Sequence, residues 1–396
     1  MLSDRVSAIK PSPTLAMNTR AKEMKASGVD VISFGVGEPD FDTPENIKEA
    51  AIKAIRDGFT KYTPVDGIPP LKEAIADKLR ADNSVEYRPE EIIVSCGAKH
   101  SLYNIAQALF NRGDEVIIPA PYWVSYPAQV LLNDAKPVFV ETHEEDSFML
   151  RPEELEKHIT GRTRALILNY PSNPTGLTYN RAALEAIAGL ALRHDFYIIS
   201  DEIYEKILYD GAGHICFPSL GADIRQKTIL VNGLSKSHAM TGWRIGYAAG
   251  PSGIIKAMSK IQGQSTSNPS SISQAAAVEA LRGPQDFISG MVSEFDKRRR
   301  YIIDELNSIE GISCIVPDGA FYAFPGITGL LGKTYNGRKV DDSSGLSLYL
   351  LEEAHIALVP GIAFGAEGYI RMSYATSMDN IREGIKRLKT AVAGAE

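Results

Sequence analysis

Short apolar runs recur through the middle of the chain, separated by longer segments in which apolar residues return every three or four positions. The runs do not alternate with polar residues, which is typical of strands covered on both faces. We expect strands near residues 92–94, 115–118, 137–140, 165–168, 196–199, 228–231 and 245–249. The helical periodicity predicts helices near residues 44–58, 71–79, 100–110, 181–194, 274–281 and 285–306. This alternation predicts an α/β domain with a mostly parallel sheet.

The pattern changes after about residue 312. Short strands are expected at 312–316, 320–324, 357–359 and 369–373, with helices at 346–353 and 379–392. These elements predict a smaller α+β domain. At the other end, Pro11 and Pro13 are incompatible with a helix interior, so we expect a surface arm there. The predicted division is 1–40 (arm and part of the small domain), 41–290 (large domain) and 291–396 (rest of the small domain).

Composition narrows the functional classes. The 396 residues are 44% hydrophobic and 23% charged, with a net charge of −7, which argues against a nucleic-acid-binding surface. No apolar run approaches the roughly 20 residues of a membrane span, and the first residues lack a secretion signal. Three distant cysteines (Cys96, Cys216, Cys314) favour reduced thiols in a cytoplasm, and the seven histidines show no metal-ligand spacing. No metal site is predicted.

Polar residues follow several of the predicted strands, where ligands bind in open parallel sheets. Lys236 lies in a Gly/Ser-rich connector between two strands, and Asp201 ends another. Tyr204 and Asn173 lie in the connections after two strands, and residues 97–99 lie between a strand and a helix, where free N–H groups bind anions. Taken singly, each has an ordinary explanation: a surface lysine, a helix cap, a core tyrosine, a loop.

Together these residues match the requirements of pyridoxal phosphate. Its aldehyde requires a lysine amine, here Lys236, and its ring nitrogen requires a carboxylate, here Asp201. Tyr204 and Asn173 are the candidate donors to its phenolate oxygen, and Trp123 offers an aromatic face for the ring. The candidate phosphate ligands are Gly97, Ala98, Lys99, Ser235 and Arg244.

The order of these motifs resembles a known family. The segments 37–40 (Gly-Glu-Pro-Asp), 121–123, 173–176, 201–204, 235–236 and 371–373 resemble class I pyridoxal-phosphate aminotransferases over nearly the whole chain. Within that family, the chain is most similar to the bacterial subgroup Iβ aspartate aminotransferases. The resemblance implies transferase fold-type I: a seven-stranded, mostly parallel sheet domain and a smaller domain built from both termini.

The resemblance also implies the roles of further residues. Arg371 would bind the substrate α-carboxylate, a task that suits its planar guanidinium, with Gly37, Trp123 and Asn173 completing that end. Tyr62 would reach the phosphate of the neighbouring subunit, which makes a homodimer the active unit. The implied binding residues for the substrate side chain are Lys10, Ser12, Thr14 and Lys99. We also expect a cis peptide bond at Asn173–Pro174.

The resulting hypothesis is transamination, with Lys236 moving a proton as general base and acid. Aspartate and glutamate are the expected donors, 2-oxoglutarate and oxaloacetate the acceptors, and prephenate a further candidate acceptor. A C–S β-lyase or an aminotransferase of another specificity on the same fold is the nearest alternative. A cofactor-binding regulator would need a DNA-binding segment that residues 1–40 are too short to supply. A nucleotide-binding protein is disfavoured because residues 97–99 match no phosphate-loop motif.

Overall fold

Seven strands form the main sheet in the computed structural model, which describes residues 2–9 and 13–393. Six of these strands run in the same direction, and only β8 (Gly246–Ala249) is reversed, being antiparallel to both of its neighbours, β2 (Ile92–Ser95) and β7 (Thr228–Gly233). The mostly parallel seven-stranded sheet is therefore confirmed. In spatial order the strands are β2 (Ile92–Ser95), β8 (Gly246–Ala249), β7 (Thr228–Gly233), β6 (Tyr197–Asp201), β5 (Thr163–Asn169), β3 (Glu115–Ala120) and β4 (Lys136–Glu141).

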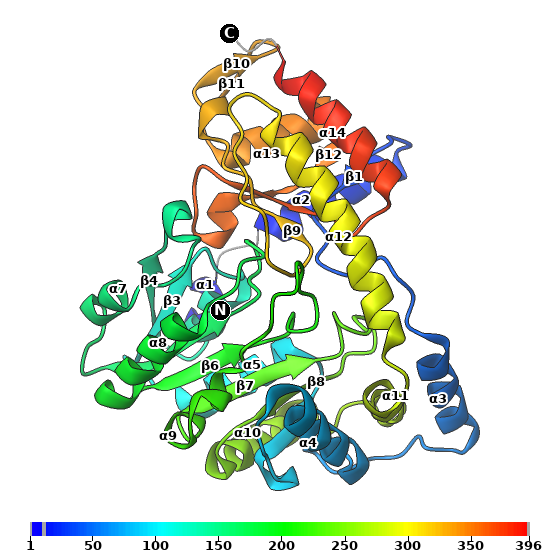
Figure 1. The fold of residues 1–396 in the computed structure, drawn as a ribbon, viewed down its shortest axis with the longest axis vertical. Coiled ribbons are helices and arrows are strands. Elements are labelled where there is room, and N and C mark those ends of the chain that lie inside the picture. Colours follow the sequence, from blue (N-terminus) through cyan, green and yellow to red (C-terminus); the bar gives the residue numbers. More distant parts are fainter. Residues whose placement is uncertain (1, 10–12, 394–396) are drawn as a thin grey trace.

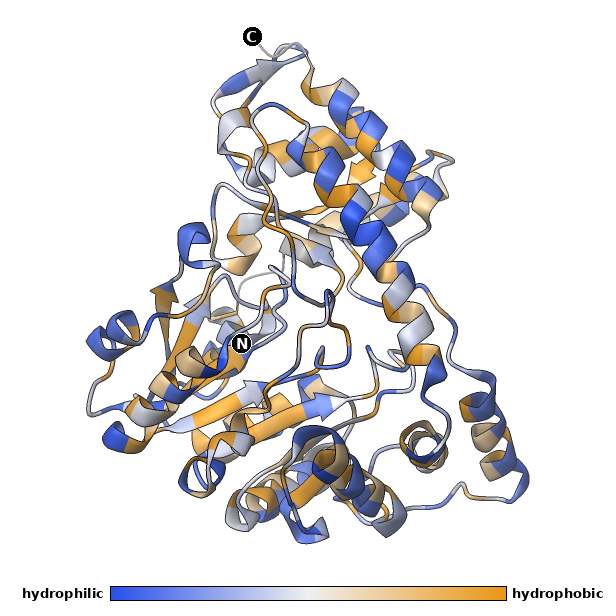
Figure 2. Ribbon diagram, in the orientation of Figure 1, coloured by the Kyte–Doolittle hydropathy of each residue, from blue (hydrophilic) through white to orange (hydrophobic). Residues whose placement is uncertain are grey.

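Helices cover both faces of this sheet, as the unbroken apolar strands require. Ile93 packs with residues of α5 (Ala98–Leu109) and α10 (Ser252–Ser265), whereas its neighbours Ile92 and Val94 pack with residues of α3 (Glu45–Arg56), α4 (Pro69–Asn83) and α11 (Ser271–Arg282). Figure 2 shows the apolar strands between more polar helix surfaces. The helices around the sheet are α3 (Glu45–Arg56), α4 (Pro69–Asn83), α5 (Ala98–Leu109), α6 (Ser125–Leu131), α7 (Pro152–Lys157), α8 (Arg181–His194), α9 (Ala222–Arg225), α10 (Ser252–Ser265) and α11 (Ser271–Arg282).

A second, smaller body lies above the sheet (Figure 1), and in it a segment from the N-terminal part of the chain pairs with one from the C-terminal part. Its pairings are β1 (Ile32–Ser33) with β12 (Ile356–Ala357), and the antiparallel sheet β13 (Val359–Pro360), β14 (Ile370–Ser373) and β9 (Tyr322–Ala323). A hairpin joins β10 (Lys333–Tyr335) to β11 (Arg338–Val340). Its helices are α2 (Pro13–Ala26), α13 (Ser343–Glu353) and α14 (Met378–Val392), and a short α1 (Asp4–Ser7) precedes α2.

The long helix α12 (Asp286–Asn307) runs from the sheet body into the smaller one (Figure 1). It crosses the expected domain boundary at residue 290. The predicted domain limits at 40/41 and 290/291 remain a proposal. Among the described residues, no helix combines the length and the apolar character needed to cross a membrane.

One expected strand does not form, and the N-terminal segment contains a helix. Residues 13–26 form helix α2, with Pro13 as its first residue, where a missing N–H costs no hydrogen bond; the surface arm remains a prediction. Residues 312–316 form only an isolated bridge from Ser313 to Gly326. The side chain of Asn307 bonds both the N–H and the carbonyl of Cys314, which occupies backbone groups that a strand would pair.

Candidate active site

The predicted residues meet in one cavity of about 440 Å³ at the carboxyl ends of the sheet strands, under the smaller body. Strands β5, β6 and β7 end toward it, and β14 contributes a side chain from above. The predicted residues that line it are Gly37, Ala98, Lys99, Trp123, Asn173, Asp201, Tyr204, Ser235, Lys236, Arg244 and Arg371. The cavity therefore joins both bodies and most of the predicted site.

Lys236 lies in the turn after β7, and its ammonium donates to the Gly37 carbonyl at 2.5 Å. Burial lowers the pKa of this amine to about 8 from 10.5, and the nearby Arg371 and Arg244 act in the same direction. The carboxylates of Glu38 and Asp201 oppose that shift. A sizeable neutral fraction is thus present near neutral pH, as a nucleophilic and basic lysine needs.

Asp201 ends β6 and is buried, with 4% of its surface exposed. The Tyr126 hydroxyl of α6 donates to Asp201 Oδ2 at 2.7 Å. Burial raises the pKa of Asp201 to about 6, while the Tyr126 hydrogen bond lowers it. Because a pyridinium brought to this carboxylate would favour its charged form, Asp201 suits the partner of a protonated ring nitrogen.

The backbone around Asp201 is held by a residue that the sequence analysis did not identify. The Asn169 amide at the end of β5 donates to the Asp201 carbonyl at 2.9 Å and accepts the Asn173 N–H at 2.8 Å. One side chain thus fixes two predicted site residues relative to each other.

The candidate phosphate ligands form an anion-binding site at one part of the cavity. Gly97 caps the N-terminus of α5 with φ +90°, and a Cβ there would lie 2.4 Å from the Arg244 guanidinium. A Cβ at Gly246 would lie 2.2 Å from the backbone nitrogen of Ala98. Only glycine permits this close approach of β8, the helix N-terminus and an arginine. Buried Ser235 lies in the same cavity. The residues therefore fit a phosphorylated aldehyde cofactor.

Arg371 lies on β14 and lines the same cavity. Its guanidinium donates to Asn173 Oδ1 at 2.9 Å and to the Gly35 carbonyl at 2.8 Å. Its buried Nε finds no acceptor among the residues that the structure describes. A buried arginine with a free N–H beside the candidate nucleophile is well suited to bind a carboxylate.

Lys99 is a second cation in this cavity. Its ammonium lies 4.8 Å from the centroid of the Trp123 ring. Burial, followed by repulsion from Arg244, lowers its pKa. An anion in the cavity would relieve that repulsion.

Several predictions lie elsewhere. Tyr62 is 92% exposed and is not part of the cavity of its own chain. Lys10 and Ser12 lie outside the described residues, and Thr14 is in the first turn of α2 with its side chain outside the described set. The expected cis bond at Asn173–Pro174 is wrong, since the cis bonds are Ala120–Pro121 and Tyr170–Pro171. The chain around Pro174 turns through backbone hydrogen bonds between Ser172 and Gly176 and between Ser172 and Leu177.

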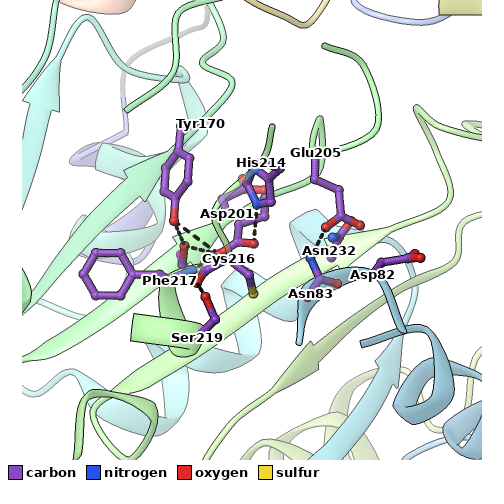
Figure 3. Close-up of polar contacts among 12 residues, drawn as sticks. Asp82, Asn83, Tyr170, Asp201, Glu205, His214, Cys216, Phe217, Ser219 and Asn232 are labelled. Carbon is purple, nitrogen blue, oxygen red and sulfur yellow. Dashed lines mark hydrogen bonds and ion pairs between the residues drawn. The ribbon is translucent and has the colours of Figure 1, made fainter. Parts of the chain in front are cut away.

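Among the described residues, one group of side chains has ligand atoms close enough together to hold a metal ion: Glu202, Glu205 and His214. Its carboxylates already have protein partners. Lys78 pairs with Glu205. Asn83 also donates to Glu205 at 2.7 Å, as Figure 3 shows. Glu202 accepts from Ser200, from the Phe217 N–H and from His214. A cation would have to displace the Lys78 ammonium, so this cluster is an ion-pair network.

Fold and site together define a class: enzymes that use a lysine amine and an aldehyde cofactor at the ends of a mostly parallel sheet. The family model "aminotransferase class I and II" matches residues 29–388. The chain belongs to this family of pyridoxal-phosphate-dependent aminotransferases.

Individual relatives match along the whole chain. The chain is 51% identical over 393 residues to a probable aspartate/prephenate aminotransferase of Rickettsia bellii, covering 99% of this chain and 98% of the relative. It is 49% identical over 395 residues to the aspartate/prephenate aminotransferase of Nitrosomonas europaea, covering 99% and 100%. The crystal structure of the Rhizobium meliloti aspartate aminotransferase matches with a TM-score of 0.97 at 46% identity, covering 100% of both chains.

Proposed function

We propose that this chain is an aspartate aminotransferase that moves the amino group of aspartate or glutamate to 2-oxoglutarate or oxaloacetate, with prephenate as a further acceptor. The observation that carries the proposal is that Arg371 and Lys99 share one cavity with Lys236. Two cations around a reactive amine suit a substrate with two carboxylates. The full-length relatives named as aspartate and aspartate/prephenate aminotransferases support the same assignment.

Arg371 is the proposed ligand of the α-carboxylate. Its Nη1 is held by Asn173 and its Nη2 by Gly35, while its Nε has no partner among the described residues. The guanidinium is therefore oriented before substrate arrives, which lowers the entropy cost of binding. Lys99 is the proposed ligand of the side-chain carboxylate, and Lys10, Ser12 and Thr14 remain proposed contributors from the N-terminal segment.

Lys236 is the proposed acid and base. When bound, the cofactor supplies the aldehyde that accepts the amino group and the electron-withdrawing ring that makes the substrate Cα proton acidic. The neutral Lys236 amine takes the proton from the substrate Cα. It then gives the proton to the carbon of the cofactor's former aldehyde group. Asp201 is the proposed partner of the ring nitrogen, and Tyr204 and Asn173 those of the phenolate oxygen. The proposed phosphate ligands are Gly97, Ala98, Lys99, Ser235 and Arg244, and Trp123 covers the ring.

We further propose a cytoplasmic homodimer in which Tyr62 of each chain contributes to the phosphate site of the other. The exposed position of this tyrosine, outside its own cavity, supports such a role.

The test is a half-reaction titration of the purified holoenzyme, following cofactor absorbance against a panel of amino acids and 2-oxo acids. Aspartate and glutamate should convert the spectrum at lower concentrations than alanine or the aromatic amino acids. Lys236→Ala, which keeps the cavity and lacks the amine, should show no turnover. A preference for monocarboxylate donors, or formation of pyruvate and ammonia from sulfur-containing amino acids, would contradict the proposal.

A further inference from the structure

Tyr322 occupies the contact between the two bodies within the cavity, and the sequence analysis gave it no role. It lies on β9, which pairs with the Arg371-bearing strand β14 through Ser373. The side chain is fully buried and lines the cavity. Its two ends contact two of the predicted site residues, Tyr204 and Arg371.

The hydroxyl end contacts Tyr204. The two phenol oxygens lie 2.7 Å apart and form a buried hydrogen bond between β9 and the segment after β6. Each hydroxyl carries one proton. If Tyr204 donates its proton to the cofactor phenolate oxygen, the proton between the two phenols must be that of Tyr322. Tyr322 would then hold the Tyr204 hydroxyl with its own proton directed toward the cofactor.

The ring end contacts Arg371. The guanidinium carbon lies 4.6 Å from the centroid of the Tyr322 ring and 5.1 Å from the centroid of the Phe364 ring. Among the described residues, no carboxylate forms an ion pair with this buried arginine. The aromatic faces therefore supply part of the electrostatic support that keeps the guanidinium charged and in place.

We propose that Tyr322 is a positioning residue that links the cofactor end of the site to the carboxylate end. Its hydroxyl orients Tyr204, and its ring holds Arg371. The inference rests on the proposed function because it takes Arg371 as the ligand of the substrate carboxylate.

The position of Gly37 allows an independent test of the role of the Tyr322 hydroxyl. A Cβ at Gly37 would lie 2.8 Å from the Tyr322 oxygen but 3.8 Å from the ring carbon that bears it. Alanine at this position would therefore collide with the hydroxyl and leave the ring in ordinary contact.

The first experiment compares holoenzymes carrying Tyr322→Phe, which removes only the hydroxyl, and Tyr322→Leu, which also removes the ring. Tyr374→Phe is the matched control, because the Tyr374 hydroxyl bonds that of Tyr209 at 3.3 Å in the same core, away from the cavity. The readouts are the pH titration of cofactor absorbance, the Kd of maleate as a non-reacting dicarboxylate, and the Tm.

Tyr322→Phe should raise the titration midpoint by roughly 0.5–1 pH unit, because a less well oriented Tyr204 leaves more negative charge on the phenolate oxygen to hold a proton. Its maleate Kd should stay near that of the wild type. Tyr322→Leu should raise the maleate Kd a further fivefold to tenfold or so, since the ring beneath Arg371 is lost. Tyr374→Phe should change neither value. An unchanged midpoint in Tyr322→Phe, or equal maleate affinities for the Phe and Leu variants, would overturn the proposal.

The second experiment is a double-mutant cycle that does not depend on the Leu variant folding. Gly37→Ala should shift the cofactor titration and weaken maleate binding, and adding Tyr322→Phe should return both values toward those of Tyr322→Phe alone. Additive effects of the two substitutions would mean that Gly37→Ala does not act through the Tyr322 hydroxyl. That result would refute the inference. If the wild type neither binds maleate nor accepts aspartate, the proposed function fails, while the cofactor titrations still test the link from Tyr322 to Tyr204.

Discussion

The hydroxyl of Tyr126 donates to Asp201 Oδ2 at 2.7 Å, and both side chains are buried. The bond joins α6 to the end of β6, so a helix on one face of the sheet sets the orientation of a carboxylate at its edge. A neutral donor keeps this carboxylate charged without placing a cation where the cofactor ring nitrogen would lie.

Tyr126→Phe should weaken cofactor binding about tenfold, since hydrogen bonds to charged groups contribute about 1.5–3 kcal/mol. The pKa of Asp201, about 6 with the bond in place, should rise without it. The protonated fraction of Asp201 grows as pH falls, so the loss should be larger at pH 6 than at pH 8. Equilibrium dialysis of pyridoxal phosphate measures this. An analogue with carbon in place of the ring nitrogen serves as control, and equal losses for both ligands would argue for a purely structural effect.

The Lys236 amine should react with half its maximal rate near pH 8. Only the neutral amine is nucleophilic, and the pKa is lowered to about 8, so reactivity should rise with pH through this value. Competitive acetylation of the apoenzyme, read by mass spectrometry of the Lys236 peptide, gives the midpoint. A midpoint near the ordinary lysine value of about 10.4 would contradict the proposed environment.

Lys99→Ala should raise KM for dicarboxylate substrates about tenfold and for monocarboxylate substrates much less, because a charge-assisted hydrogen bond to the second carboxylate is lost. Steady-state kinetics with aspartate and alanine separate the two cases. Lys260→Ala, an exposed lysine on α10 outside the cavity, is the control. An equal rise for both substrates would assign Lys99 to the phosphate alone.

Lys78→Met should destabilise the protein by about 3–5 kcal/mol, because it leaves the buried Glu205 carboxylate without its partner. The double variant Lys78→Met/Glu205→Leu should recover most of that loss in denaturant unfolding. The pKa of Glu205 is lowered to about 2 from 4.5, so the contribution is present above about pH 4.5 and is lost as pH falls toward 2. Lys53→Met, in an exposed pair with Asp57, should cost less than about 1 kcal/mol. Similar costs for Lys53→Met and Lys78→Met would contradict this assignment.

Mixing chains that carry Lys236→Ala with chains that carry Tyr62→Ala should restore native sites, if Tyr62 acts in the partner's cavity. A hybrid dimer then contains one site with both residues intact. Sedimentation gives the oligomeric state, and cofactor affinity of the refolded mixture gives the complementation. A monomer in solution, or no gain on mixing, would exclude the shared site.

The residues predicted correctly as neighbours share one property: they lie at or just after strand ends. Asp201, Asn173 and Lys236 follow apolar runs of the parallel sheet, and parallel strands bring their carboxyl ends to the same edge. Local pattern and topology together therefore suffice to group them. Gly37 and Arg371 were assigned to the site from the family resemblance. No local sequence pattern indicates that the smaller body covers this edge of the sheet.

Tyr126, Asn169 and Tyr322 were missed for a different reason. Each acts through a contact with a residue far away in the sequence: Tyr126 and Asn169 with Asp201, and Tyr322 with Tyr204 and Arg371. An apolar core offers the same places to tyrosines without any function, so residue type alone carries no signal. Helix α10 is a different kind of miss, since Pro251 followed by Ile255 and Met258 is a recognisable helix start with one apolar face.

The pairing of β1 with β12 has a consequence for biosynthesis. Ile32 pairs with Ile356, so one of the first segments to leave the ribosome waits for a partner made about 320 residues later. At roughly 5–20 residues per second, that wait lasts on the order of 16–65 s. During it the sheet strands can already associate, whereas the upper body, with Arg371 and Tyr322, closes only after the C-terminal quarter has been translated.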